Sequence, residues 1–175
     1  MPRTLKISFG ISLILLCLVA TFLGIGFVQE VEYKHSISGS LNVPRAEIWT
    51  FLVDFKDIPN RRKDVIQVEI MELDPATSIP IKWKELTEMG GYMTFQRGET
   101  IPNQKLEVQL IDSSYKIRGK WTYELSEQHG ITTITVTERS EIKSPLIRGA
   151  YFLAGRDSTL QQELAMIQNH FKAGR

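Results

Sequence analysis

Apolar residues follow two different patterns along the chain. The first is a run of 22 residues without a charge, from Ile7 to Val28. As an α-helix this run would span roughly 33 Å, enough to cross the hydrocarbon core of a bilayer. From residue 29 onward, apolar positions instead alternate or recur at helical spacing, which is typical of a folded domain.

Charges on either side of the first run set its expected orientation. Arg3 and Lys6 precede it, and Glu30 and Glu32 follow it. The positive-inside rule therefore predicts a cytoplasmic segment 1–6, a transmembrane helix 7–28 and an extracytoplasmic domain 29–175. A cytoplasmic-facing domain is the less favoured orientation. A cleaved signal peptide is the alternative, but the run is longer than an ordinary signal core and no clear small-residue cleavage site follows it.

The pattern of residues 29–175 predicts strands followed by a helix. Val31–Leu41 alternates as a strand, 44–53 has helical spacing, and 54–63 reads as a short helix or irregular turn. Six further strands, separated by turn residues, are predicted at 65–73, 81–88, 92–101, 105–111, 117–126 and 131–142. The last segment, Leu146 to Phe171, has one apolar stripe and is expected to form a single helix.

This order of elements predicts an α+β domain. Short connections join neighbouring antiparallel strands, so the strands should form a seven-stranded curved sheet. The C-terminal helix is the element long enough to cover the apolar face of that sheet. One helix cannot fill so wide a concave face, and a cavity between the two is therefore expected.

Several local motifs resemble those of a known superfamily. The segment Val43-Pro44-Arg45-Ala46-Glu47-Ile48-Trp49-Thr50-Phe51-Leu52-Val53-Asp54-Phe55, followed by Ile58-Pro59 and 65–69, and the strands 117–125 and 132–138, are similar to START-like helix-grip (SRPBCC) proteins. The polyketide cyclase/dehydrase family is the most similar branch. The resemblance implies a helix-grip fold that binds a lipid or other hydrophobic small molecule, with no shared catalytic motif. Asn60-Arg61-Arg62 replaces the Trp-x-Pro element that this family often has.

Composition narrows the possible chemistry. Lys and Arg total 21 and Asp and Glu total 20, a balance that argues against nucleic-acid binding by bulk electrostatics. The single cysteine, Cys17, excludes an intramolecular disulfide and a thiolate metal cluster. The three histidines form no metal-ligand pair at close spacing. We therefore expect no metal, no cofactor and no nucleic-acid partner.

Strand alternation gives candidate ligand contacts. Side chains expected to face the cavity are Trp83, Met93, Phe95, Arg97, Leu106, Val108, Trp121, Tyr123, Ile134 and Val136, with Ala150 and Leu153 from the helix. Arg97 could bind an anionic ligand group, or it could pair with Glu85 or Glu138. Glu85 and Glu138 share the inward parity. They are weak catalytic candidates if burial raises a pKa.

One basic cluster stands out in the domain. Arg61, Arg62 and Lys63 follow Pro59, in a loop that borders the cavity mouth in this fold. They could contact anionic lipid headgroups at the membrane surface. The alternative is an ordinary solvated loop.

Three functions are compatible with these features. The leading hypothesis is a membrane-anchored carrier or sensor that binds a hydrophobic molecule without catalysis. The second is an enzyme of the cyclase, dehydratase or hydrolase type that uses cavity carboxylates. The third is a structural or interaction protein whose own side chains fill the core.

Overall fold

The computed structural model describes residues 3–173. The chain divides into two compact units, Met1–Val31 with Ile142–Arg156 and Glu32–Glu141 with Asp157–Arg175. The segment 142–156 therefore groups with the N-terminal helix and not with the sheet.

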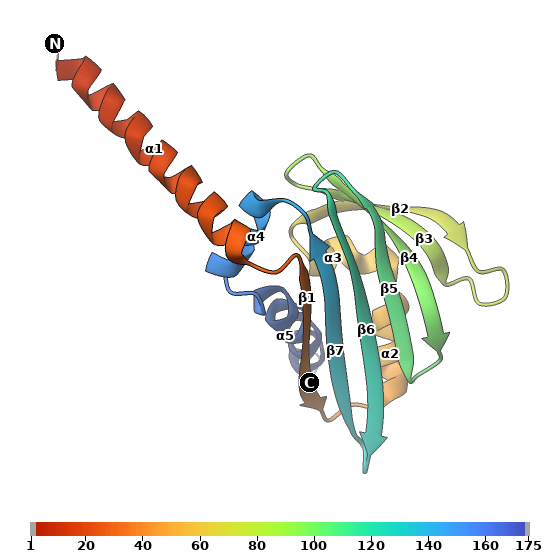
Figure 1. Cartoon of the computed structure of the whole chain (residues 1–175). Helices are drawn as coiled ribbons and strands as arrows, with labels where there is room; N and C mark the ends of the chain where they lie inside the picture. Colours follow the sequence, from red (N-terminus) through yellow and green to blue (C-terminus); the bar gives the residue numbers. More distant parts are fainter. Residues whose placement is uncertain (1–2, 174–175) are drawn as a thin grey trace. The chain divides into compact units, whose positions relative to one another are not determined.

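A single antiparallel sheet forms most of the second unit (Figure 1). Its strands in the described residues are β1 (Glu32–Leu41), β2 (Val65–Leu73), β3 (Pro80–Thr87), β4 (Tyr92–Ile101), β5 (Lys105–Ser113), β6 (Ile117–Gln128) and β7 (Ile131–Ile142). They lie in the order β1-β7-β6-β5-β4-β3-β2. Strands β2 to β7 are thus a meander, as the short turns predicted, and β1 pairs with β7 at one edge. The predicted seven-stranded antiparallel sheet is confirmed.

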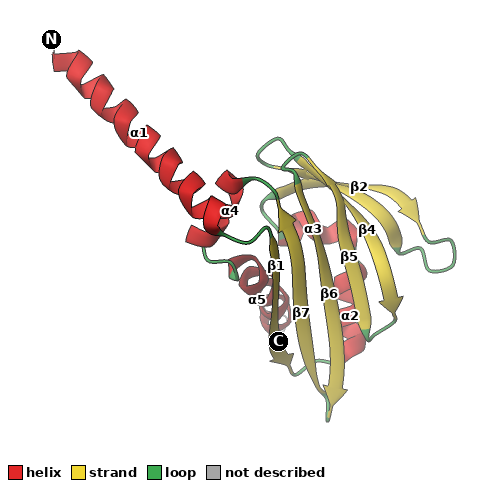
Figure 2. Cartoon of the chain, viewed as in Figure 1, coloured by secondary structure: helices red, strands yellow, loops and turns green. Residues whose placement is uncertain are grey.

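Helices cover one face of this sheet (Figure 2). They are α2 (Arg45–Val53), the 3-10 turn η1 (Phe55–Asp57), α3 (Ile58–Arg61) and α5 (Ser158–Ala173). Ile48 of α2, Ile134 of β7 and Ile167 of α5 are all fully buried in one core. Gly39 lets α5 approach β1 closely, since a Cβ there would lie 2.7 Å from Gln168 Nε2 and 3.0 Å from Leu164 Cδ1.

The first unit consists of two helices, α1 (Arg3–Val28) and α4 (Pro145–Leu153). Within the described part of α1, the stretch Ile11–Val28 is long and apolar enough to cross a membrane. Ser144 caps α4, accepting a hydrogen bond from the backbone N–H of Ile147 at 3.4 Å.

The expectation of one helix over 146–171 is wrong, because the segment breaks between α4 and α5. Gly155 adopts a φ of +88°, and its N–H bonds to the carbonyl of Phe152. A glycine in this left-handed conformation commonly ends a helix, since it has no Cβ to strain. The apolar stripe continues past the break, so periodicity alone did not reveal it.

Candidate functional site

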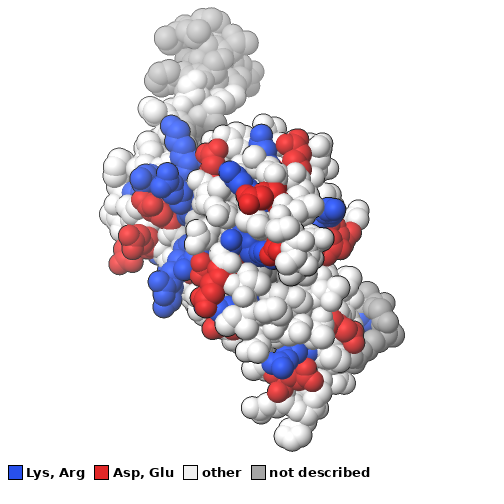
Figure 3. Space-filling model, turned by 90° about the vertical axis from the view of Figure 1, so that its right-hand side faces the viewer, with Lys and Arg blue, Asp and Glu red and all other residues white. Residues whose placement is uncertain are grey.

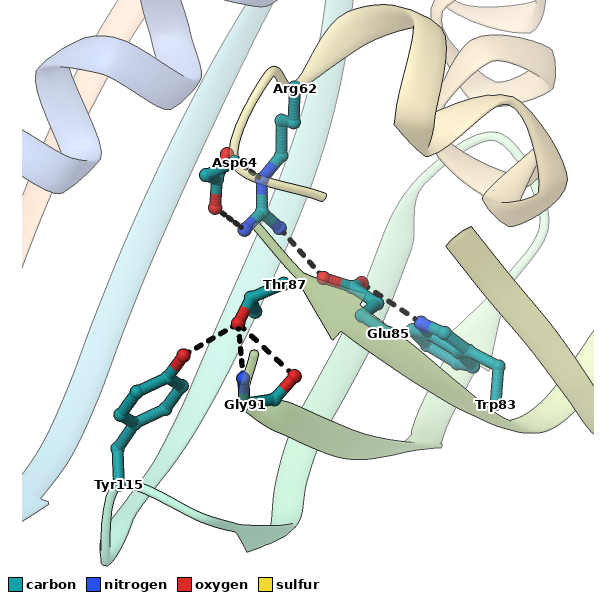
Figure 4. A network of polar contacts seen from close by, with 7 residues as sticks. All are labelled: Arg62, Asp64, Trp83, Glu85, Thr87, Gly91 and Tyr115. Atoms are coloured by element: carbon teal, nitrogen blue, oxygen red, sulfur yellow. Dashed lines mark hydrogen bonds and ion pairs between the residues drawn. The ribbon is translucent and has the colours of Figure 1, made fainter. Parts of the chain in front are cut away.

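Glu85 lies at the centre of a buried polar group on the helix-covered face of the sheet. Its side chain, on β3, is 2% exposed. It accepts hydrogen bonds of 3.1 Å from Trp83 Nε1 and from Arg62 Nη1 (Figure 4). Burial raises the pKa of Glu85, although the charge of Arg62 and the Trp83 hydrogen bond partly oppose this by favouring the carboxylate.

Arg62 reaches Glu85 from the loop that follows α3. The same guanidinium donates to Asp64, with Nη2 to Oδ2 at 2.7 Å and Nε to Oδ1 at 3.3 Å (Figure 4). Burial opposes its charge, but the two carboxylates outweigh burial and raise the pKa of Arg62. The planar fork of the guanidinium thus joins one exposed and one buried acid.

A second acid, half-buried, lies in the same electrostatic environment. Glu163 of α5 accepts a hydrogen bond of 2.9 Å from the hydroxyl of Tyr123 on β6. Burial raises the pKa of Glu163, while the positive charge of Arg62 lowers it. Burial and the charge of Glu163 together raise the pKa of Tyr123 well above its ordinary value, so its hydroxyl stays a donor. We call Arg62, Glu85, Tyr123 and Glu163 the inner polar cluster.

Sequence analysis identified only part of this cluster. Strand alternation placed Glu85 and Tyr123 on the inner face, and both lie there. Glu163 was missed, although a signal existed: it lies three residues after the buried Leu160 and four before the buried Ile167. A charged residue at that spacing falls on the apolar stripe of a helix.

The basic loop differs from the expected lipid-facing or solvated cluster. Arg61 donates to Asp57 at 2.8 Å and to the carbonyls of Phe51 and Asp54, each at 2.6 Å. Its guanidinium also lies 4.0 Å from the centroid of the Phe51 ring. The guanidinium groups of Arg61 and Arg62 are therefore hydrogen-bonded to other residues of the domain. Lys63 is the one exposed side chain of the three.

Arg97 pairs with neither of the acids considered from the sequence. Its Nη2 lies 2.7 Å from Oδ2 of Asp74, in the β2–β3 turn. Asp74 also accepts the backbone N–H groups of Ala76 and Thr77, at 2.9 and 3.3 Å. A register shift in the β4–β5 pairing follows Arg97, and such a shift breaks simple alternation. Arg97 therefore braces a turn, and its guanidinium is already paired with a carboxylate.

Glu138 forms a separate buried polar group with the start of α5. Its side chain on β7 is 1% exposed and accepts a hydrogen bond of 3.2 Å from the hydroxyl of Thr159. Burial raises the pKa of Glu138. Nearby, Asp157 accepts a hydrogen bond from Tyr33 and lies 3.5 Å from Nε2 of His35. Glu85 and Glu138 thus belong to two different groups.

Apolar side chains on the inner face fall into two classes. Phe55 stacks on Trp83 with ring centroids 3.9 Å apart, and Trp83 stacks on Phe95 at 5.6 Å. The buried members of the predicted set are Trp83, Phe95, Leu106, Val108, Ile134 and Val136. Three other residues of the predicted set pack on this core but stay partly exposed: Met93, Trp121 and Tyr123. Three apolar residues outside the predicted set do the same: Ile117, Leu164 and Met166.

Two candidates lie outside this unit. Ala150 and Leu153 belong to α4, which groups with α1, and both are exposed. They were assigned to the cavity because 146–171 was read as one helix. The break at Gly155 removes the reason for that assignment.

Basic and acidic side chains are intermixed on the visible surface. The face in Figure 3 carries basic and acidic side chains side by side, in keeping with 21 basic and 20 acidic residues. Among the described residues, no group of three His, Cys, Asp or Glu side chains could hold a metal ion.

Comparison with solved structures identifies the fold. A START superfamily protein from Mycobacterium smegmatis superposes with a TM-score of 0.67 at 15% identity, covering 81% of this chain and 99% of that one. The Zhui aromatase/cyclase from Streptomyces sp. R1128 gives a TM-score of 0.65 at 10% identity, over 81% and 94%. Ara h 8.0201 gives 0.61 at 13% identity, over 81% and 99%. The chain has the START-like helix-grip fold, as its motifs indicated.

Comparison of sequences alone finds no similar protein or family. No family model matches the chain, and no curated protein sequence matches it. At identities of 10–15%, the similarity establishes the fold.

Proposed function

We propose that this protein is a membrane-anchored carrier or sensor for a lipid or another hydrophobic small molecule. The observation that carries the proposal is the set of partly exposed apolar side chains on the inner face. Met93, Ile117 and Trp121 pack on the core yet keep accessible surface. Apolar surface of this kind gains free energy when a hydrophobic ligand covers it.

The inner polar cluster supports a ligand with one polar end. Tyr123 lies on the same strand as Ile117 and Trp121, and its hydroxyl contacts Glu163. A ligand head group could therefore exchange hydrogen bonds with this pair while its apolar part lies along β6. A few polar groups within an apolar surface fix the orientation of a ligand.

The anchoring part of the proposal rests on α1. Three residues, 29–31, separate Val28 at the end of α1 from Glu32 at the start of β1. An extended link of that length spans roughly 13 Å. With 11–28 in a bilayer, the domain would therefore remain close to the membrane, where hydrophobic ligands are stored.

Lipid extraction from the purified full chain tests the binding proposal. The protein is isolated in detergent, extracted with organic solvent, and the extract is analysed by mass spectrometry. Ile117→Trp fills the partly exposed inner surface and should reduce the amount of bound molecule. Ile131→Trp is the matched control, because Ile131 is 49% exposed and precedes the inward-facing Thr132. Equal content in both variants would place the ligand elsewhere, and an empty wild type would favour a filled core.

An enzymatic role at the same inner face is the second candidate. The observation that favours it is the presence of two carboxyls on the inner face, Glu85 beside Arg62 and Glu163 beside Tyr123. Burial raises the pKa of both, so they could exchange protons with a ligand. Incubating the extracted molecule with wild-type protein would reveal any change in its mass. Loss of that conversion in Glu85→Gln or Glu163→Gln, with binding retained, would establish catalysis.

A further inference from the structure

Helix α4 carries almost no charge. The segment 144–155 contains a single charged residue, Arg148. Leu146, Phe152 and Leu153 are nevertheless 44%, 45% and 54% exposed. A helix that is apolar all round is stable in a protein core or in a membrane, and these side chains are not in a core.

The backbones of α4 and α1 approach each other closely at two glycines. A Cβ on Gly26 would lie 1.6 Å from the carbonyl oxygen of Pro145, and a Cβ on Gly149 would lie 2.0 Å from that of Phe22. In contrast, a Cβ on Gly24 would meet no atom within 4 Å. Small residues permit this kind of close packing between helices in membranes.

Arg148 fixes this contact with its charge turned inward. Its Nε donates to the carbonyl of Gly26 at 2.8 Å, and its Nη1 donates to the carbonyls of Ile142 and Lys143 at 2.8 and 2.9 Å. Gly26 lies in the last turn of α1, where carbonyl groups lack helical partners and a cation is favourable. The one charge of α4 is thereby satisfied within the unit, and its outer side is left apolar.

The position of the contact along α1 determines the depth of α4. Figure 1 shows α4 crossing α1 near the C-terminal end of α1. The contacts at Phe22 and Gly26 lie roughly 3–9 Å from the end of the helix at Val28, at 1.5 Å per residue. Both positions fall inside the apolar stretch 11–28. If that stretch lies in a bilayer, α4 cannot lie outside it, because the two backbones touch.

We propose that α4 is an interfacial helix, which lies in the headgroup–acyl boundary of the bilayer that α1 crosses and contacts lipid through Leu146, Phe152 and Leu153. This inference rests on the proposed anchoring by α1. The bilayer is the occupant because the outer side of α4 is continuous with the exposed apolar surface of α1, where Leu16 and Phe27 are 65% and 70% exposed. Interfacial helices bury their apolar side to about 5–10 Å, which agrees with the depth of the contact.

Fluorescent labelling of the full chain tests this position. Single-cysteine proteins are labelled with NBD and reconstituted in vesicles of phosphatidylcholine and phosphatidylglycerol. The native Cys17 reports on α1, and Leu153→Cys combined with Cys17→Ser reports on α4. Met89→Cys combined with Cys17→Ser is the matched control, because Met89 is an apolar residue, 87% exposed, in the turn after β3. Leu146→Cys combined with Cys17→Ser provides a second probe on α4 if the first variant does not fold.

If α4 lies in the headgroup–acyl boundary, the emission of the label at position 153 should be shifted to the blue. Lipids that carry a shallow doxyl group should quench it strongly, and aqueous iodide should not. The label at Met89 should show the reverse. Quenching of the Cys17 label by lipid, combined with iodide access at Leu153, would overturn the inference while the anchor stands. Protection of Leu153 from both quenchers would also overturn it, since a protein would then cover α4. A Cys17 label that lipid does not quench would remove the anchor itself.

Discussion

The guanidinium of Arg62 and the carboxylate of Glu85 are joined by a hydrogen bond of 3.1 Å. The sequence had placed Arg62 in a loop that contacts lipid or solvent, and Glu85 on the inner face of the sheet. The side chain of Glu85 is 2% exposed and that of Arg62 is 29% exposed. One residue of the basic loop thus neutralises an acid inside the domain.

Removing the acceptor oxygens of Glu85 should destabilise the domain. In Glu85→Leu, Nη1 of Arg62 and Nε1 of Trp83 both lose their acceptor, while Asp64 still pairs with the other side of the guanidinium. We expect a loss of about 1–3 kcal/mol in the free energy of unfolding, the usual cost when a buried donor is left without an acceptor. Thermal unfolding in detergent, followed by circular dichroism, measures it.

The control is Glu88→Leu, at an exposed position in the turn after β3. It should leave stability unchanged. An equal loss in both variants would show that the ion pair with Arg62 contributes nothing specific.

Glu138 should make stability fall as pH rises. Burial raises the pKa of Glu138 in the folded protein above the ordinary value of 4.5, so the folded state binds this proton more tightly than the unfolded state does. The contribution of Glu138 to the free energy of unfolding is therefore favourable below pH 4.5, and it is lost as the pH rises through the pKa of the folded state.

In Glu138→Gln this part of the pH dependence should disappear, because the amide does not titrate. The measurement is the midpoint of thermal unfolding for both proteins, from mildly acidic to mildly alkaline buffer. Parallel curves would contradict the raised pKa. Glu124→Gln, on an exposed position of β6, is the control.

Arg97 should matter for the β2–β3 turn and not for the ligand. In Arg97→Gln, the pairing with Asp74 is lost, and the amides of 74–79 should exchange faster with solvent. Hydrogen exchange followed by mass spectrometry measures this. Arg139→Gln, at an exposed position of β7, should leave the turn unchanged. A fall in lipid content without faster exchange would instead restore Arg97 as a ligand contact.

Arg148 should hold α4 against α1. In Arg148→Met the carbonyls of Gly26, Ile142 and Lys143 lose their donor. Unpaired buried carbonyls cost about 1–3 kcal/mol each, so we expect α4 to open more often. Faster amide exchange within 147–153 would show this, with the exposed Arg118→Met as control. Unchanged exchange would mean that the glycine contact suffices.

The sequence by itself determined the strands and their order along the chain. Alternation in segments such as 117–125, and short turns such as His129-Gly130, depend on residues next to each other in the chain, so local pattern suffices to predict them. The inward parity of Trp83 and Glu85 followed for the same reason, since no bulge interrupts β3 between them.

Only the tertiary structure decided the partners of the charges. Arg62 and Glu85 are 23 residues apart, Arg97 and Asp74 also 23, and Tyr123 and Glu163 are 40 apart. Sequence spacing does not specify such pairs, because bulges and loops set which side chains meet. The packing of α4 was likewise decided by the tertiary structure. Its apolar stripe matches that of α5, so the sequence pattern reads as one helix. The left-handed Gly155 separates the two helices, and the close contacts at Gly26 and Gly149 pack α4 against α1.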